Sequence, residues 1–123
     1  MLASSVGAAA LPPLAENRAV SQQMLAAAVG DRIRTECPTI SPRLFVVWRK
    51  ARALERYARQ QGYSAAQIDA YTSSDAHRAA LAVRAEAWLA ERGARPGDAA
   101  AHCRVGAAEI AANSPIGELL RNR

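Results

Sequence analysis

Four side chains of this sequence are soft or borderline metal ligands: Cys37, His77, His102 and Cys103. Zinc is bound by thiolates and imidazoles, so a zinc site is the first possibility to weigh. Zinc sites usually draw on closely spaced pairs such as C-x-x-C, and the sequence has no such pair. His102 and Cys103 are adjacent, and neighbouring side chains on a helix diverge by about 100°. We therefore expect no metal centre.

The two cysteines can also be considered as nucleophiles. A catalytic thiol needs a base and a lowered pKa, which a helix N-terminus commonly helps to provide. Cys37 instead follows the expected end of a helix, where the helix dipole disfavours a thiolate. Cys103 lies on the expected apolar side of its helix, with Ala107, Ile110 and Ala111. Neither cysteine therefore has the setting of a nucleophile.

A disulfide between Cys37 and Cys103 fits the sequence better. It would tie the end of the first expected helix to the fifth, and closing so long a loop contributes roughly 4 kcal/mol. The apolar residues are largely alanine, and a small core of that kind gains much from a covalent link. Two separate buried thiols remain the alternative. The disulfide predicts an oxidising compartment.

Other groups for acid–base chemistry are scattered. Asp69, Asp75 and Glu86 are candidates, but local spacing brings no second carboxylate or nucleophile to any of them. His77 falls in the first turn of an expected helix, where capping or solvent exposure explains it. The sequence contains no glycine-rich phosphate loop, H-E-x-x-H or G-x-S-x-G. We expect no enzyme activity, no cofactor and no small-molecule substrate.

Arginine supplies nearly all the positive charge of the chain. The formal net charge is +5, and Lys50 is the only lysine. Four arginines recur at helical spacing within one expected helix, and we predict that they bind a partner: Arg49, Arg52, Arg56 and Arg59. Such a row suits an acidic protein surface or anionic lipid headgroups, although a solvated helix face is the alternative. No recognition helix or stacking aromatic set accompanies it, so we expect no nucleic acid.

The elements that must position these residues are all expected to be helices. Capping residues and apolar spacing predict an all-α, compact bundle of five or six helices, with no strand after residue 20. Ser41 is the expected N-cap of the second helix, with Pro42 at its first position. The expected helices cover residues 18–36, 42–61, 65–71, a long stretch that begins after Ser73 or Ser74 and ends at Gly93, 99–112 and a short stretch after Ser114. Ser64 with Gln67 is an expected capping box, Asp98 is an expected N-cap, and Asn113 is the expected end of its helix.

Apolar residues at helical spacing predict which sides are buried. On the second helix the expected core side is Leu44, Val47, Trp48, Ala51, Leu54 and Ala58, with the arginines opposite. We expect Trp48, Leu54, Trp88 and Leu89 to be buried. Residues 1–17 form a signal-like or extended segment, in which Ala8, Ala9 and Ala10 fit a small-x-small cleavage pattern without a basic n-region. Residues 18–123 are expected to form a single helical domain.

Several stretches carry a family resemblance. They include "AAAVGDRIRTECPTIS", "AEAWLAERGA", "AEIAANSPIGELLR" and the run G-Y-S-x-x-x-I-x-x-Y, which ends at Tyr71 before a helix start containing Ser74 and Asp75. Together these stretches resemble a small bacterial family of secreted helical proteins described only as a domain of unknown function. The resemblance covers roughly residues 20–122.

The resemblance implies a role beside respiratory complex I, because genes of that family lie among those for the complex. It implies a non-catalytic accessory subunit of the NADH:quinone oxidoreductase that supports assembly or stability from the periplasmic side. The expected partners are subunits of the membrane complex, with anionic lipid headgroups as a second expected partner. The expected location is the periplasm, peripheral to the inner membrane. The alternative is a free periplasmic helical protein that binds a ligand or acts under stress.

Overall fold

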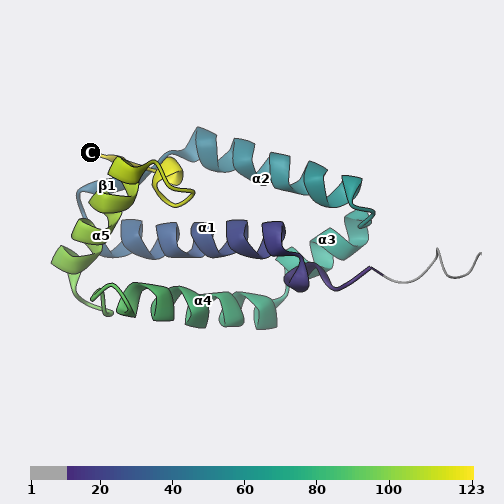
Figure 1. Cartoon of the computed structure of the whole chain (residues 1–123), viewed down its shortest axis with the longest axis horizontal. Coiled ribbons are helices and arrows are strands. Elements are labelled where there is room, and N and C mark those ends of the chain that lie inside the picture. The colour runs from purple at the N-terminus through teal and green to yellow at the C-terminus, as the bar shows by residue number, and fades with distance from the viewer. Residues whose placement is uncertain (1–10) are drawn as a thin grey trace, which may run out of the picture.

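The computed structural model of the protein describes residues 11–123. Over this range the chain forms five α-helices, two short 3₁₀ helices and one two-stranded antiparallel ribbon (Figure 1). The fold is thus the all-α bundle that the sequence predicts, with a small ribbon added. The elements are η2 (Leu14–Glu16), α1 (Arg18–Glu36), β1 (Ile40–Pro42), α2 (Leu44–Gln60), α3 (Ala65–Thr72), α4 (Asp75–Ala90), α5 (Ala99–Ala112), η3 (Gly117–Leu119) and β2 (Leu120–Asn122).

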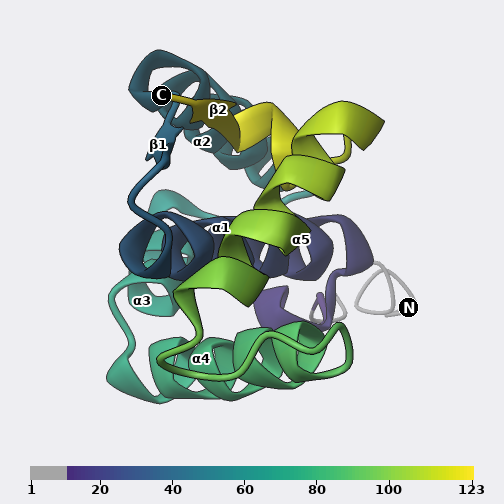
Figure 2. The same cartoon turned by 90° about the vertical axis from the view of Figure 1, so that its left-hand side faces the viewer.

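Helix α1 is the centre of the molecule. Helix α2 runs along one side of it and α4 along the other, and α3 joins those two at one end (Figure 1). Helix α5 crosses the opposite end, from the α4 side to the ribbon, as the end-on view makes clear (Figure 2). Helix α1 packs most closely on α4 and next on α5, whereas it touches α2 far less.

Side-chain caps explain why most of the helices begin where they do. The Ser64 hydroxyl accepts the N–H of Gln67, whose own side chain accepts the N–H of Ser64, which is the capping box that the sequence predicts. Asn113 ends α5 in the left-handed conformation, with φ of 53°. Three further helices begin at a side chain that accepts a backbone N–H: Asn17, Ser74 and Asp98.

The ribbon corrects three expectations, and the first is that no strand follows residue 20. Ser41 and Pro42 do not start α2; they lie in β1, which pairs with β2 so that Ser41 faces Arg121. The expected helix after Ser114 is reduced to η3, followed by β2. Local capping signals give way here because the two segments satisfy each other's backbone groups, with the Arg43 N–H donating to the Leu119 carbonyl at 2.8 Å.

Buried apolar side chains form two clusters. The larger joins α1, α4 and α5 around residues with essentially no exposure, such as Val29, Ile33 and Leu89. The smaller lies where η2 meets α1, α2 and α3: Leu14, Val20, Ala58, Tyr63 and Tyr71. The two clusters divide the molecule into a closely packed side and a side built around α2 and α3.

Gly106 allows α5 to lie close to α1 and the ribbon. A Cβ at this position would fall 2.5 Å from Ile40 Cδ1 and 2.7 Å from Ile33 Cγ2. Any side chain at residue 106 would therefore force both isoleucine side chains to move away. The absence of a side chain is what brings the middle of α5 onto the core.

The described part of the predicted N-terminal segment, residues 11–17, lies against the helices of the same chain. Leu14 is buried in the smaller cluster, and the Tyr63 hydroxyl donates a hydrogen bond to the Pro12 carbonyl. The predicted cleavage pattern at Ala8, Ala9 and Ala10 lies outside the described residues. Within residues 11–123, no helix combines the length and the apolar character needed to cross a bilayer.

Candidate functional site

The two cysteines form the predicted disulfide. Cys37 follows the last residue of α1 and is fully buried, and Cys103 lies in the second turn of α5, with the two Cα atoms 5.1 Å apart. The Thr39 hydroxyl lies 3.2 Å from the Cys37 sulfur. Because 66 positions separate the cysteines, the link holds together helices that are distant in the sequence. The two sulfurs have a structural place in the fold.

The two histidines are used in packing. His102 is almost fully buried, and its Nδ1 lies 2.7 Å from the Asp98 carbonyl oxygen. The ring of His77 packs on Tyr71, with centroids 4.7 Å apart. Among residues 11–123 no group of three or more His, Cys, Asp or Glu side chains is arranged to hold a metal ion.

The burial of His102 corrects the expected apolar side of α5. Ala107 and Ala111 are exposed, and the core side of the helix is instead Ala101, His102, Val105 and Gly106. The sequence reading counted glycine and histidine as residues outside the core and therefore missed this side. Gly106 lets α5 pack closely, and the buried His102 ring has a hydrogen-bond partner in the first turn of its own helix.

The three acid–base candidates lie on the surface. The Asp75 side chain is almost completely exposed, and it faces Arg78 at 3.6 Å. Glu86 accepts a hydrogen bond from Arg32 at 3.1 Å, which links α4 to α1. Asp69 is exposed on α3.

The outward side of α2 differs most from the prediction. Trp48, expected in the core, is 56% exposed, and Leu44 is 72% exposed. Phe45 is 68% exposed and stacks on Trp48, with ring centroids 6.0 Å apart. We call the exposed side of this helix the α2 surface; it consists of Leu44, Phe45, Trp48, Arg49, Arg52, Arg56 and Arg59.

The rotation of α2 about its axis explains this exposure. The side of the helix that faces the rest of the molecule carries Ala58, which is buried, and Val47, Lys50 and Leu54, which are partly buried. At 100° per residue, Leu44 and Trp48 lie at the edge of the expected core side, next to the arginines. The expectation that the arginines lie opposite Trp48 is therefore wrong: aromatic rings and arginines share one side.

Two arginines of the α2 surface lie over its rings. The guanidinium carbon of Arg49 is 5.4 Å from the centre of the Phe45 ring, and that of Arg52 is 5.6 Å from the Trp48 ring. Both distances are within the range of cation–π attraction. The only carboxylate nearby on the helix is Glu55, 3.8 Å from Arg52. The predicted set of four arginines is thus exposed, and it comes with aromatic side chains that the sequence reading did not assign to it.

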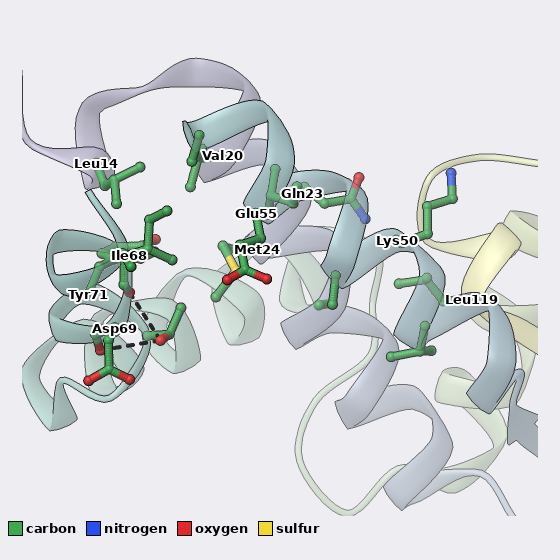
Figure 3. A pocket seen from close by; sticks show the side chains of 17 residues that line it. Leu14, Val20, Gln23, Met24, Lys50, Glu55, Ile68, Asp69, Tyr71 and Leu119 are labelled. Atoms are coloured by element: carbon green, nitrogen blue, oxygen red, sulfur yellow. Dashed lines mark hydrogen bonds between the residues drawn. The ribbon is translucent and has the colours of Figure 1, made fainter. Parts of the chain in front are cut away.

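A groove of about 340 Å³ lies on the opposite side of α2 (Figure 3). Helices α1, α2 and α3 line it with mainly apolar side chains, and Leu14 and Ile68 stand at one end in the close view. Lys50 stands at the other end, where its ammonium group pairs with Glu118 at 2.6 Å. Burial raises the pKa of the Tyr71 phenol in this lining, and the charge of Arg84 acts in the opposite direction.

Sequence reasoning found the arginines and missed the rings and the groove. One signal for the rings was present: residues 44–48 are five apolar residues in a row, which surround a helix completely. Whichever side of α2 faces the core, another apolar side must then face outward. The groove has no comparable local signal, because it depends on how far α2 stands from α1.

Comparison with known proteins identifies a family. The model of a family described as a family of unknown function (DUF5333) matches residues 12–121. No curated protein and no solved structure matches the chain.

Proposed function

The chain belongs to the DUF5333 family of unknown function. From its surface and from the resemblance noted in the sequence, we propose that it is a non-catalytic accessory subunit of respiratory complex I. In this role it binds the NADH:quinone oxidoreductase from the periplasmic side, peripheral to the inner membrane. It supports assembly or stability of the membrane arm and leaves the electron-transfer chemistry to the other subunits.

The observation that carries the proposal is the α2 surface. Leu44, Phe45 and Trp48 are all more than half exposed and lie side by side at the start of one helix. A contiguous exposed patch of large apolar side chains usually marks an interaction site. Aromatic and arginine side chains are also the types enriched at the energetic centres of protein interfaces. The composition and exposure of the α2 surface are thus those of a protein-binding site.

The disulfide supports the periplasmic part of the proposal. Disulfides persist in oxidising compartments such as the bacterial periplasm and are rare where thiols are kept reduced. Cys37 and Cys103 are both consumed in the link, so the described chain holds no free thiol. The resemblance noted from the sequence supports the connection with complex I.

Co-purification tests the proposal. Complex I is isolated from gently solubilised native membranes through an affinity tag on one of its core subunits, and the chain is sought in it by mass spectrometry. We expect the chain in the complex, and we expect a deletion strain to oxidise NADH nearly normally per assembled enzyme while assembling less of the membrane arm. If the chain is absent from the complex and runs alone in the soluble periplasmic fraction, the proposal is wrong.

Matched variants connect the result to the α2 surface. The double change Phe45→Ser and Trp48→Ser removes the exposed rings, and we expect it to release the protein from the complex. Val83→Ser is the control, because Val83 is 68% exposed on α4 and lies away from the α2 surface. Release by the control change as well would show that the α2 surface is not the contact.

The groove favours a second candidate function, a free periplasmic protein that binds an apolar ligand. Its volume of about 340 Å³ and mainly apolar lining are within the range of small-molecule sites. Retention of a small molecule through native purification, detected by mass spectrometry of the denatured protein, supports this candidate. A substitution in the groove wall, Met24→Trp, should then abolish retention.

A further inference from the structure

We propose that the α2 surface rests on an anionic lipid bilayer, with Phe45 and Trp48 entering the interface and the arginines binding lipid phosphates. This inference rests on the proposed function and makes its contact specific: the α2 surface helps to hold the protein beside the membrane complex by binding the adjoining bilayer. It requires no subunit of that complex, so it can be tested on the purified protein alone.

The shape of the α2 surface is the first argument. Its rings and arginines at positions 45, 48, 49, 52, 56 and 59 fall within an arc of about 100° around the helix. From the first to the last of them the helix rises about 20 Å. Helix α2 forms one long edge of the molecule, so this strip lies along an outer side (Figures 1 and 2). A bilayer can contact such a strip over its whole length.

Charge is the second argument. Helix α2 contains five basic residues and a single carboxylate, Glu55, in a chain whose formal net charge is +5. Basic residues close to a membrane surface are attracted by anionic headgroups, and the attraction increases with each further charge. More basic side chains lie just beyond the N-terminal end of α2, where Arg43 and Arg121 border the same shallow pocket as Phe45.

The pairing of each ring with an arginine favours lipid over a protein pocket. Arg49 lies over Phe45 and Arg52 over Trp48, both within 6 Å of the ring centres. If either ring filled a pocket on a protein, its guanidinium would lose water and would need a buried partner. At a bilayer interface the ring can enter the acyl boundary while the guanidinium stays at the level of the phosphates. One orientation of α2 then satisfies both groups.

The aromatic side chains are of the interfacial kind. Tryptophan is enriched at membrane–water boundaries because it combines a large apolar ring with a polar N–H group. Trp48 is at the centre of the exposed apolar group, between Leu44 and the arginine row. Binding by such a surface is expected to be reversible and to depend on salt, since exposed charges are screened.

Vesicle sedimentation tests the inference. The purified, oxidised protein is mixed with vesicles of phosphatidylcholine alone or of phosphatidylcholine and phosphatidylglycerol in equal parts. We expect binding to the anionic vesicles only. Arg49→Gln with Arg52→Gln should weaken it about 25-fold, since each charge contributes about fivefold. Phe45→Ser with Trp48→Ser should weaken it about tenfold or more.

Control changes separate the surface from net charge. Arg18→Gln with Arg95→Gln removes the same charge from exposed positions outside α2 and should change binding far less. Far-UV circular dichroism and melting temperature establish that each variant is folded. Equal weakening by this control pair would overturn the inference, and so would anionic-vesicle binding that is unchanged when both rings are removed.

Tryptophan fluorescence provides a second measurement, in which the α2 surface itself is left unchanged. In a Trp88→Phe protein, Trp48 is the only tryptophan, and its emission should shift to shorter wavelength on addition of anionic vesicles. An unshifted spectrum overturns the inference.

If vesicle binding is absent while the ring variant is still released from complex I, the α2 surface binds a protein, and the proposed function stands without the lipid contact. If vesicles bind but the chain is absent from complex I, the lipid contact stands and the accessory role fails.

Discussion

The two long sides of α1 are built differently. On one side α4 and α5 cover it with fully buried side chains, and the disulfide fixes the end of the helix. On the other side α2 stands away from it (Figure 1). A groove lies on the inner side of α2, and exposed aromatic rings lie on its outer side. The first side therefore provides the stability of the fold. The second is the side on which apolar residues remain available for binding.

This difference shows how a chain with few large apolar residues can spare three of them. Leu44, Phe45 and Trp48 would be expected in the core of a small domain, yet all three are exposed. Small residues take their place inside: Gly106 lets α5 approach closely, and Ala85 is fully buried in α4. Close backbone packing and the covalent link together compensate for the missing large side chains.

Removal of the disulfide should have the largest effect on the closely packed side. We expect the double change Cys37→Ser and Cys103→Ser to lower the free energy of unfolding by about 4 kcal/mol, because a loop spanning 66 positions is no longer constrained in the unfolded chain. Urea denaturation at equilibrium measures this. A reducing agent should destabilise the wild-type protein and leave the double variant unaffected. A change below about 1 kcal/mol would show that the link adds little to this side.

A core truncation on the same side should have the next largest effect. Leu89 is 1% exposed in α4, and Leu89→Ala should cost about 3 kcal/mol through lost burial and the cavity that remains. Leu54 is the matched position on the α2 side, where it is partly buried along the groove. Leu54→Ala should cost less than half as much in the same denaturation experiment. Equal costs would mean that the two sides are packed alike.

The smallest effect is expected at the α2 surface. Trp48→Ala should change the free energy of unfolding by no more than about 0.5 kcal/mol, since the ring is more than half exposed. Thermal unfolding followed by circular dichroism is sufficient to detect a larger change. A cost of several kcal/mol would place Trp48 in the core, as the apolar spacing of the sequence first suggested.

Local signals predicted the elements of this fold well. The capping box at Ser64, the cap at Asp98 and the helix end at Asn113 each depend on a few neighbouring residues, and all three are found. The ribbon could not be predicted this way, because Ser41 pairs with Arg121, which lies 80 positions later in the chain. The order and the ends of the helices can thus be predicted from the sequence, whereas the pairing of segments that are far apart in the chain cannot.

The candidate site was only partly predictable for the same reason. The arginine row follows from spacing alone, and the disulfide follows from the presence of two cysteines with no other suitable setting. Which side of α2 faces the core depends on contacts with segments far away in the sequence: η2 and α3 around Ala58, and η3, where Glu118 pairs with Lys50. That arrangement turned Trp48 outward and opened the groove.

Covalent footprinting of the two tryptophans tests most directly whether the α2 surface is covered in the cell. Hydroxyl-radical oxidation is measured by mass spectrometry on native membranes and on the purified protein. Trp88 is partly buried, and the guanidinium carbon of Arg92 lies 3.5 Å from the centre of its ring. Trp88 therefore acts as the internal reference. We expect oxidation of Trp48 to fall several-fold in the membranes, while that of Trp88 is unchanged. Equal oxidation of Trp48 in both samples would show that the surface is uncovered and would contradict the account.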